Sequence, residues 1–250
     1  MIHIMGFPTA SIITVTQISR QNTLKLTREY VDNQDYPNLL EWVIVEGSKS
    51  AEDCMKNETF VKSLVCKVPI VYVPGDGTQH LGELRNISNR NSKGDIIIVM
   101  DDDDWYPSTR VSHAVERLAC SPCKIAGCSP KMMYDYDLEI LLQFRQFGPN
   151  HSTNDCFAYK REYLDENSYD PSKDSSEEAS FTKQFTNPLE QLDPNHTIIS
   201  SSHSMNTFSK KELSIKACLL LNPVDPSHGT MYPPAYRSYH NIIDPEAFKR

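Results

Sequence analysis

The stretch "GDIIIVMDDDDWYP" at positions 94–107 decides how this chain is organised. The apolar residues at 96–100 predict a buried strand, and four aspartates follow that strand directly. Adjacent carboxylates near a protein surface repel one another by on the order of 1 kcal/mol per pair. A divalent cation would offset this repulsion, because hard cations take carboxylate oxygens as ligands. We therefore interpret the stretch as a strand that ends at a cation site.

Two other interpretations of the aspartates stay open. The run would also suit a solvated acidic turn that caps the helix expected after Ser108, or a calcium-binding loop. The calcium loop is disfavoured because its alternating Asp/Asn spacing, its glycine and its distal glutamate are missing. Along an extended strand, alternation would place Asp101 and Asp103 on one side and Asp102 and Asp104 on the other.

Strand and helix patterns alternate four times through the first hundred residues. Gly94 is expected to end the helix that begins near Leu81. Short, continuous apolar strands indicate parallel strands that are covered on both faces, as in a doubly wound α/β sheet. Ligands of such sheets bind beyond the carboxyl ends of the strands, so the turns after these strands should meet at one crevice. The predicted strands are 11–18, 42–45, 68–73 and 96–100.

The second half of the chain is less regular. Residues 138–147 fit either a helix or a strand, and residues 165–176 form a polar stretch that suits a loop over the site. The helices expected here are 108–119 and 177–185, and the expected strands are 124–128, 155–159 and 197–201.

Composition narrows the class of protein. The net charge of −8 and the pI near 5.5 argue against a protein that binds a nucleic-acid backbone. No apolar stretch approaches the roughly 18 residues of a membrane span, and no signal peptide is predicted, so a cytoplasmic location is expected. The pair Cys120 and Cys123 would suit zinc, but no second pair completes such a site.

Several elements, taken in order, resemble glycosyltransferases of the GT-A fold and family 2 type. The matching stretches are "NQDYPN" at 33–38, "VEGS" at 45–48, "LRN" at 84–86 and the segment 94–107, which stands where that family has its DxD motif. The resemblance covers roughly residues 10–210. The aspartates followed by an aromatic residue also resemble members encoded by large DNA viruses, which would place the protein in the host cytoplasm.

The resemblance implies an architecture: a Rossmann-like, mostly parallel sheet flanked by helices, with an irregular acceptor-binding half. It implies one domain at 1–210, divided into a nucleotide-sugar-binding half at 1–104 and an acceptor and catalytic half at 105–210. Residues 211–250 are then a C-terminal extension that packs on the domain.

The resemblance also implies a donor site. Asp103 would ligate Mn²⁺ or Mg²⁺, and His203 would be a further ligand unless it is an ordinary structural histidine. The residues implied to contact the nucleotide-sugar are Thr16, Gln17, Glu46, Arg85, Asp101 and Asp102. Arg85 is otherwise a surface arginine.

Transfer with inversion needs a general base for the acceptor hydroxyl. The family's acidic motif at a helix start corresponds to "SSEEASF" at 175–181, so Glu178 is the expected base and Glu177 the second candidate. The alternative is a pair of carboxylates that stabilise a helix N-terminus.

The implied activity is metal-dependent, inverting transfer of a sugar. The donor would be a nucleotide-diphospho-sugar, a UDP-sugar being the first choice, and the acceptor a hydroxyl of a glycan or glycoprotein. Two rivals are a nucleotidyltransferase, which lacks its glycine-rich basic loop here, and an inactive sugar- or nucleotide-binding module of the same fold.

Overall fold

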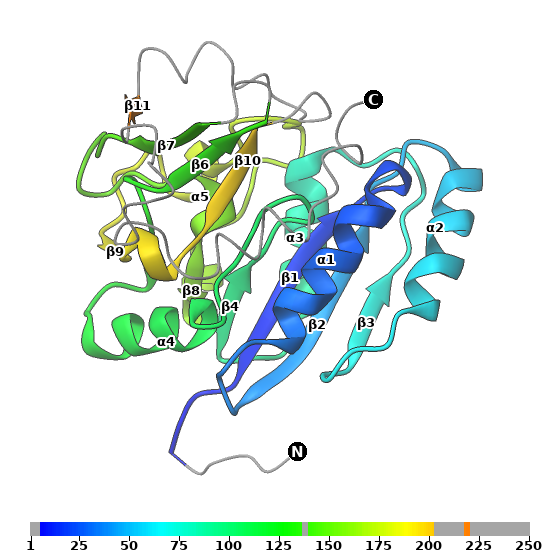
Figure 1. The fold of residues 1–250 in the computed structure, drawn as a ribbon, viewed down its shortest axis with the longest axis horizontal. Helices are drawn as coiled ribbons and strands as arrows, with labels where there is room; N and C mark the ends of the chain where they lie inside the picture. Colours follow the sequence, from blue (N-terminus) through cyan, green and yellow to red (C-terminus); the bar gives the residue numbers. More distant parts are fainter. Residues whose placement is uncertain (1–5, 137–139, 203–217, 221–250) are drawn as a thin grey trace, which may run out of the picture.

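The computed structural model describes residues 6–136, 140–202 and 218–220. Two sheets lie in this part of the chain (Figure 1). The larger sheet has the strand order β3-β2-β1-β4-β8-β5-β9, and the smaller has the order β10-β6-β7-β11. No helix in the described part is long and apolar enough to cross a membrane.

The first four strands form the parallel half of the larger sheet, as the apolar stretches predict. They are β1 (Ala10–Thr16), β2 (Leu39–Glu46), β3 (Ile70–Val73) and β4 (Ile96–Val99). The helices between them are α1 (Gln21–Asp32), α2 (Ala51–Ser63) and α3 (Leu81–Asn91). All four strands run in one direction, so their carboxyl ends meet at one edge.

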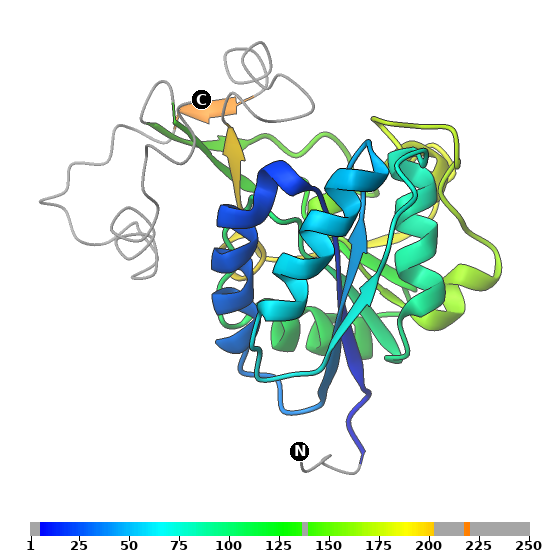
Figure 2. The ribbon, with the colours of Figure 1, turned by 90° about the vertical axis from the view of Figure 1, so that its right-hand side faces the viewer.

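Helices cover both faces of this sheet (Figures 1 and 2). Side chains of α1, α2 and α4 (Arg110–Cys120) join one core, together with Ile12, Ile44 and Ile98 of the strands. The other core holds Ile13, Val43 and Ile97 with Leu84 of α3. The predicted α/β architecture with a mostly parallel sheet flanked by helices is therefore confirmed.

The second half of the chain extends the larger sheet and builds the smaller one. In the larger sheet, β8 (Ala158–Lys160) runs antiparallel between β4 and β5 (Ile125–Gly127), and β9 (Leu189–Gln191) lies at the edge. The smaller sheet contains β6 (Met132–Asp135), β7 (Ile140–Phe144), β10 (Ile199–Ser202) and β11 (Cys218–Leu220). Short helices lie between these strands: η2 (Asn154–Cys156), η3 (Arg161–Asp165), α5 (Glu178–Phe181) and η4 (Pro194–His196). A further short helix, η1 (Ile18–Arg20), joins β1 to α1 in the first half.

The two sheets meet just after the aspartates. Trp105 and Ile199 exchange backbone hydrogen bonds of 3.1 and 3.0 Å. The Asp104 carboxylate accepts a hydrogen bond of 2.7 Å from the backbone N–H of Ser201. The end of β4 is thereby tied to β10 of the smaller sheet.

Several boundaries differ from the sequence predictions. Residues 138–147 contain the strand β7, whereas the strand expected at 155–159 begins as the single turn η2. The short strands β6 and β9 were not predicted, because three or four residues carry too little pattern. The helix expected at 177–185 is only the four-residue α5.

Gly94 does not end α3, so that prediction was wrong. The helix is capped at Ser92, and a side chain at Gly94 would press on the backbone of Ser11 in β1. The glycine thus allows a close approach of two backbones. The division of the domain into a nucleotide-sugar-binding half at 1–104 and an acceptor and catalytic half at 105–210 stays a prediction. The extension at 211–250 lies outside the described residues, apart from β11.

Candidate functional site

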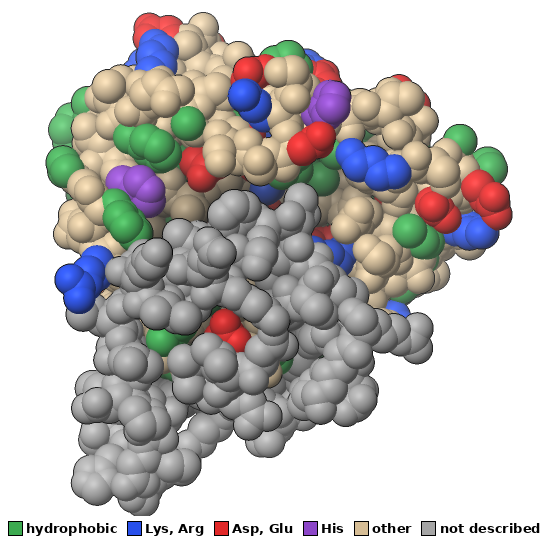
Figure 3. Space-filling model, turned by 90° about the horizontal axis from the view of Figure 1, so that it is seen from above, with side chains coloured by type: hydrophobic (Ala, Val, Ile, Leu, Met, Phe, Trp, Pro, Cys, Tyr) green, Lys and Arg blue, Asp and Glu red, His purple; other side chains and the backbone are tan. Residues whose placement is uncertain are grey.

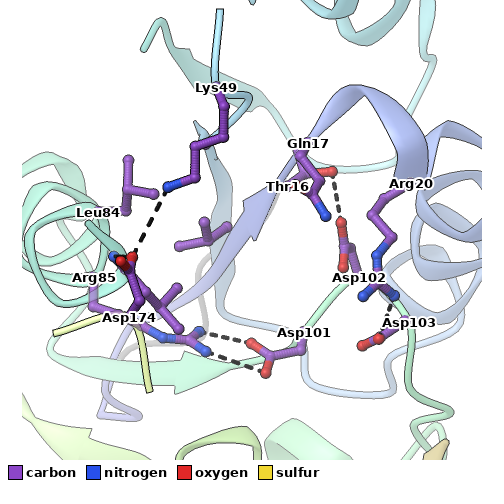
Figure 4. A pocket seen from close by; sticks show the side chains of 13 residues that line it. Thr16, Gln17, Arg20, Lys49, Leu84, Arg85, Asp101, Asp102, Asp103 and Asp174 are labelled. Atoms are coloured by element: carbon purple, nitrogen blue, oxygen red, sulfur yellow. Dashed lines mark hydrogen bonds and ion pairs between the residues drawn. The ribbon is translucent and has the colours of Figure 1, made fainter. Parts of the chain in front are cut away.

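A cavity of about 480 Å³ lies at the carboxyl ends of β1, β2 and β4 (Figure 4). Its volume is within the usual range for small-molecule sites. The turn after β2, the start of α3 and the aspartates after β4 form its walls. Six of the residues predicted from the sequence line it: Thr16, Gln17, Arg85, Asp101, Asp102 and Asp103.

The aspartates do not alternate as the extended strand predicted. β4 ends at Val99 and the chain turns at residues 102–103, so Asp101, Asp102 and Asp103 all line the cavity. Only Asp104 points elsewhere, toward the backbone of β10. The expectation was wrong because it assumed extended backbone at residues 101–104, beyond the end of β4 at Val99.

Asp102 is buried against the end of β1. Its carboxylate accepts a hydrogen bond of 2.7 Å from the Thr16 hydroxyl. Burial, which Arg20 opposes and the charges of Asp103 and Asp101 reinforce, raises the pKa of Asp102 to about 7. The three neighbouring carboxylates therefore create a strong demand for positive charge in the cavity.

Arg20 meets part of that demand. It lies in η1, lines the cavity and forms an ion pair with Asp103 (Figure 4). Burial acts to lower the pKa of Arg20, but the charges of Asp103 and Asp102 raise it above its ordinary value, so the side chain stays charged. Sequence reasoning missed this residue. The available signal was a lone arginine soon after a strand whose carboxyl end faces aspartates.

Arg85 joins the two halves of the site. Its guanidinium binds both carboxylate oxygens of Asp101, at 2.7 and 3.2 Å, and its Nε lies 3.4 Å from the Glu177 carboxylate. The Asn154 amide, with its oxygen turned to the guanidinium, accepts further hydrogen bonds at 2.9 to 3.0 Å. Burial opposes the charged form of Arg85, but Asp101 and Glu177 hold its pKa well above the ordinary value.

The two candidate bases lie side by side at the start of α5. Glu177 is buried and contacts Arg85, whereas Glu178 is half-buried and is not among the residues that line the cavity. Burial raises the pKa of Glu178, and the neighbouring charge of Glu177 raises it further. A carboxylate with a raised pKa is a better proton acceptor, which suits a general base.

Glu46 takes a different place from the one expected. Its buried carboxylate accepts hydrogen bonds from the Ser48 backbone (2.7 Å), the Asn57 amide (2.6 Å) and the Tyr72 hydroxyl (2.9 Å). It does not line the cavity, although the next residue, Gly47, does. Glu46 therefore shapes the turn under the cavity. His203 lies outside the described residues.

A loop from the second half reaches the cavity rim. Asp174 lines the cavity, and its carboxylate lies 2.6 Å from His80 and 3.9 Å from the Lys49 ammonium. It also accepts a hydrogen bond of 3.1 Å from the backbone N–H of Leu81 at the start of α3. The polar loop at 165–176 is thus fastened beside the cavity, a contact that spans too much sequence to predict.

The carboxylates of Asp101, Asp102 and Asp103 suit a hard cation, because carboxylate oxygens are the ligands that Mg²⁺ and Mn²⁺ prefer. The raised pKa of Asp102 also favours a cation, since a bound cation would stabilise the ionised carboxylate. Among the described residues, however, no three His, Cys, Asp or Glu side chains are already arranged around a common point for a metal. Arg20 holds Asp103 in this arrangement, so a cation would have to compete with it.

Comparison with known proteins gives a family and a fold. The sequence model of glycosyl transferase family 2 matches residues 11–168. No curated protein matches the sequence.

Solved structures share the architecture. Residues 1–349 of S. aureus TarS align with a TM-score of 0.57 at 14% identity, covering 78% of this chain and 60% of that chain. The TarS complex with UDP-GlcNAc gives 0.60 at 14% identity, covering 79% and 60%. The mannosyltransferase PcManGT from Pyrobaculum calidifontis, in complex with GDP-Man and Mn²⁺, gives 0.58 at 16% identity, covering 81% and 59%. The chain thus spans about 60% of the length of these structures, and at such identities the likeness concerns the fold.

Proposed function

The chain belongs to glycosyl transferase family 2, and on that premise we propose that it transfers a sugar from a nucleotide-diphospho-sugar to an acceptor hydroxyl. One observation carries the proposal. Arg85 binds Asp101 in the cavity and Glu177 at the start of α5. Arg85 would therefore connect a donor in the cavity to Glu177, the residue next to the proposed base Glu178 on α5.

A UDP-sugar is the proposed donor. The cavity size suits a nucleotide, and the TarS structure was solved with UDP-GlcNAc. Thr16 and Gln17 are proposed to contact the nucleotide base. Glu46 would hold the turn that places Gly47 in the wall of the cavity. Arg20 and Arg85 supply positive charge on the cavity wall, where the negative charge of a diphosphate would lie.

The proposed reaction is a direct displacement with inversion. Glu178 accepts the proton of the acceptor hydroxyl as its oxygen attacks the anomeric carbon, and Glu177 keeps its contact with Arg85. Asp103, with Asp101 and Asp102 beside it and His203 as a further candidate ligand, would hold Mn²⁺ or Mg²⁺. Such an ion would stabilise the charge of the departing diphosphate. The loop at 165–176 would limit the access of water, a competing acceptor.

The ion pair between Arg20 and Asp103 favours one second candidate. If Arg20 never leaves Asp103, the chain would be a binding module that holds a nucleotide or sugar without turning it over. The two functions differ in whether a bound donor is ever broken.

The deciding experiment is a screen of nucleotide-sugars for Mn²⁺-dependent release of sugar. We expect one UDP-sugar to be hydrolysed, with the activity lost in Asp103→Asn. Glu52→Gln, a change to an exposed side chain of α2, serves as the matched carboxylate control and should keep full activity. Tight UDP binding without turnover of any donor would favour the binding module, and binding of neither a nucleotide nor a sugar would refute both.

A further inference from the structure

Four ring-bearing side chains form a continuous row of tilted rings on the second half of the molecule, which we call the aromatic ridge: Phe144, Phe147, His151 and Phe185. Adjacent rings have centroids 6.5, 5.1 and 4.9 Å apart along this order. Phe147 is 55% exposed, although phenylalanine is normally buried. The ridge therefore presents ring surface to solvent at a fixed place.

The ridge is held in place by polar contacts beneath it. Ser129 accepts a hydrogen bond of 3.0 Å from the backbone N–H of Phe147, and its hydroxyl lies 3.1 Å from Nδ1 of His151. The Gln191 amide donates a hydrogen bond of 3.0 Å to the carbonyl of His151. Burial lowers the pKa of His151, and the charge of Lys131 lowers it further, which favours the neutral ring. The ridge is thus ordered and uncharged near neutral pH.

The backbone before Phe185 is strained. Lys183, Gln184 and Phe185 have φ values of 51°, 58° and 59°, a left-handed conformation that costs about 1 kcal/mol for each residue with a Cβ. The turn is closed by a hydrogen bond of 2.7 Å from the backbone N–H of Gln184 to the carbonyl of Ala179. Its result is that Phe185 lies against His151. Strain of this kind persists where the surrounding structure requires it, commonly at functional sites.

Lys131 connects the ridge to the candidate base. Its ammonium lies 5.8 Å from the centre of the Phe144 ring and forms a buried ion pair with Asp155. The same charge acts on the pKa values of both His151 and Glu178. The ridge is also joined to α5 directly, because Phe185 follows Gln184, whose backbone N–H donates to the carbonyl of Ala179, the residue after Glu178. Hydrophobic side chains also lie beside a histidine near the left edge of the upper face in Figure 3.

We propose that the aromatic ridge binds a saccharide unit of the acceptor. A pyranose has a flat face of C–H groups, which packs on exposed rings, and a rim of hydroxyls that needs hydrogen-bonding partners. The ridge offers rings for that face, and the imidazole of His151 adds a polar group among them. An acceptor that extends from Glu178 across the ridge would be an oligosaccharide. The inference rests on the proposed function, and it specifies the acceptor as a saccharide.

The test measures saccharide binding separately from donor binding. Chitotriose and cellotriose are titrated into the full chain by saturation-transfer NMR and calorimetry, and UDP is titrated in parallel. Phe147→Ala removes the most exposed ring of the ridge. Phe7→Ala is the matched control, because Phe7 is 60% exposed and lies before β1, at the opposite end of the strands.

We expect at least one of the two saccharides to bind, and Phe147→Ala to weaken that binding by about tenfold or more. UDP affinity should stay unchanged in both variants, and Phe7→Ala should bind the saccharide as the parent does. Equal saccharide affinity in Phe147→Ala and the parent, or binding of neither saccharide, overturns the inference. Saccharide binding through Phe147 in a chain that binds no nucleotide would uphold the ridge and refute the proposed function.

Discussion

Arg20 and Asp103 form an ion pair inside the cavity, with only 6% and 12% of their side chains exposed. The pair joins η1, which follows the first strand, to the aspartates that follow the fourth. The acidic run is therefore partly neutralised by the protein itself before any ligand arrives.

The first prediction concerns this pair. Arg20→Ala leaves several carboxylates without their nearest cation, so the free energy of unfolding should fall by about 3 kcal/mol. Urea denaturation measures the change. Arg90→Ala breaks an exposed ion pair with Glu83 and should cost less than about 1 kcal/mol. If both variants lose the same free energy of unfolding, the ion pair in the cavity stabilises the fold no more than an exposed pair does.

The second prediction separates the two glutamates of α5. Glu178→Gln should lower kcat by about 100-fold or more, because the amide cannot accept the acceptor proton. UDP affinity should be unchanged, since Glu178 does not line the cavity. Steady-state kinetics and UDP titration measure both effects. Full activity in Glu178→Gln, with loss in Glu177→Gln, would move the base by one residue.

The third prediction concerns pH. Burial, followed by the charge of Glu177, raises the pKa of Glu178, so a higher pH than usual for a glutamate is needed to ionise it. A base works only when deprotonated, and kcat/KM should therefore decline as the pH falls through this raised pKa. Glu177→Gln removes one of the raising charges and should move the acidic limb of the profile to lower pH. A limb that stays in place would show that Glu178 is not the group that titrates.

The fourth prediction concerns the loop at the rim. The backbone N–H of Gly82 donates a hydrogen bond of 2.8 Å to the carbonyl of Lys173, and any Cβ at Gly82 would overlap the carbonyl oxygen of Asp170. Gly82→Ala should therefore displace the loop, lowering the free energy of unfolding by about 1–3 kcal/mol.

Thermal or urea unfolding measures this loss. Gly148→Ala is the control, since its nearest neighbour would be a side-chain atom of His151 at 4.0 Å. Unchanged stability in Gly82→Ala would mean that the loop is not fastened there.

The parallel half of the fold was predictable because its strands are short, mostly apolar or β-branched, and separated by helical patterns. The position of the cavity followed from the same rule, and the aspartates identified its edge. What escaped prediction depends on contacts between distant segments. Asp174 and Asn154 each reach the site from a different part of the chain, and nothing in their local sequence reveals the partner they meet. Arg20 offered only its place soon after a strand whose carboxyl end faces the aspartates.

The positions of Asp102 and Glu46 also differ from those expected from the sequence. Alternation along an extended strand would place Asp102 on the side away from Asp101 and Asp103, yet all three line the cavity because the strand ends at Val99. Glu46 was expected to face the ligand, but three donors from the protein occupy its carboxylate. A side chain's partners, unlike its place in a strand, are set by packing.

Because the Arg85 guanidinium binds both Asp101 and Glu177, a ligand that contacts one carboxylate would affect a ligand that contacts the other. A ligand that weakens the contact of Arg85 with Asp101 changes how firmly Arg85 holds Glu177, and the reverse is equally true. On the proposed function, a donor in the cavity and an acceptor beside α5 would then alter each other's affinity by the same factor, as thermodynamic reciprocity requires. Removing Asp101 and Glu177 together should not cost the sum of the separate losses, because both single changes act on one cation.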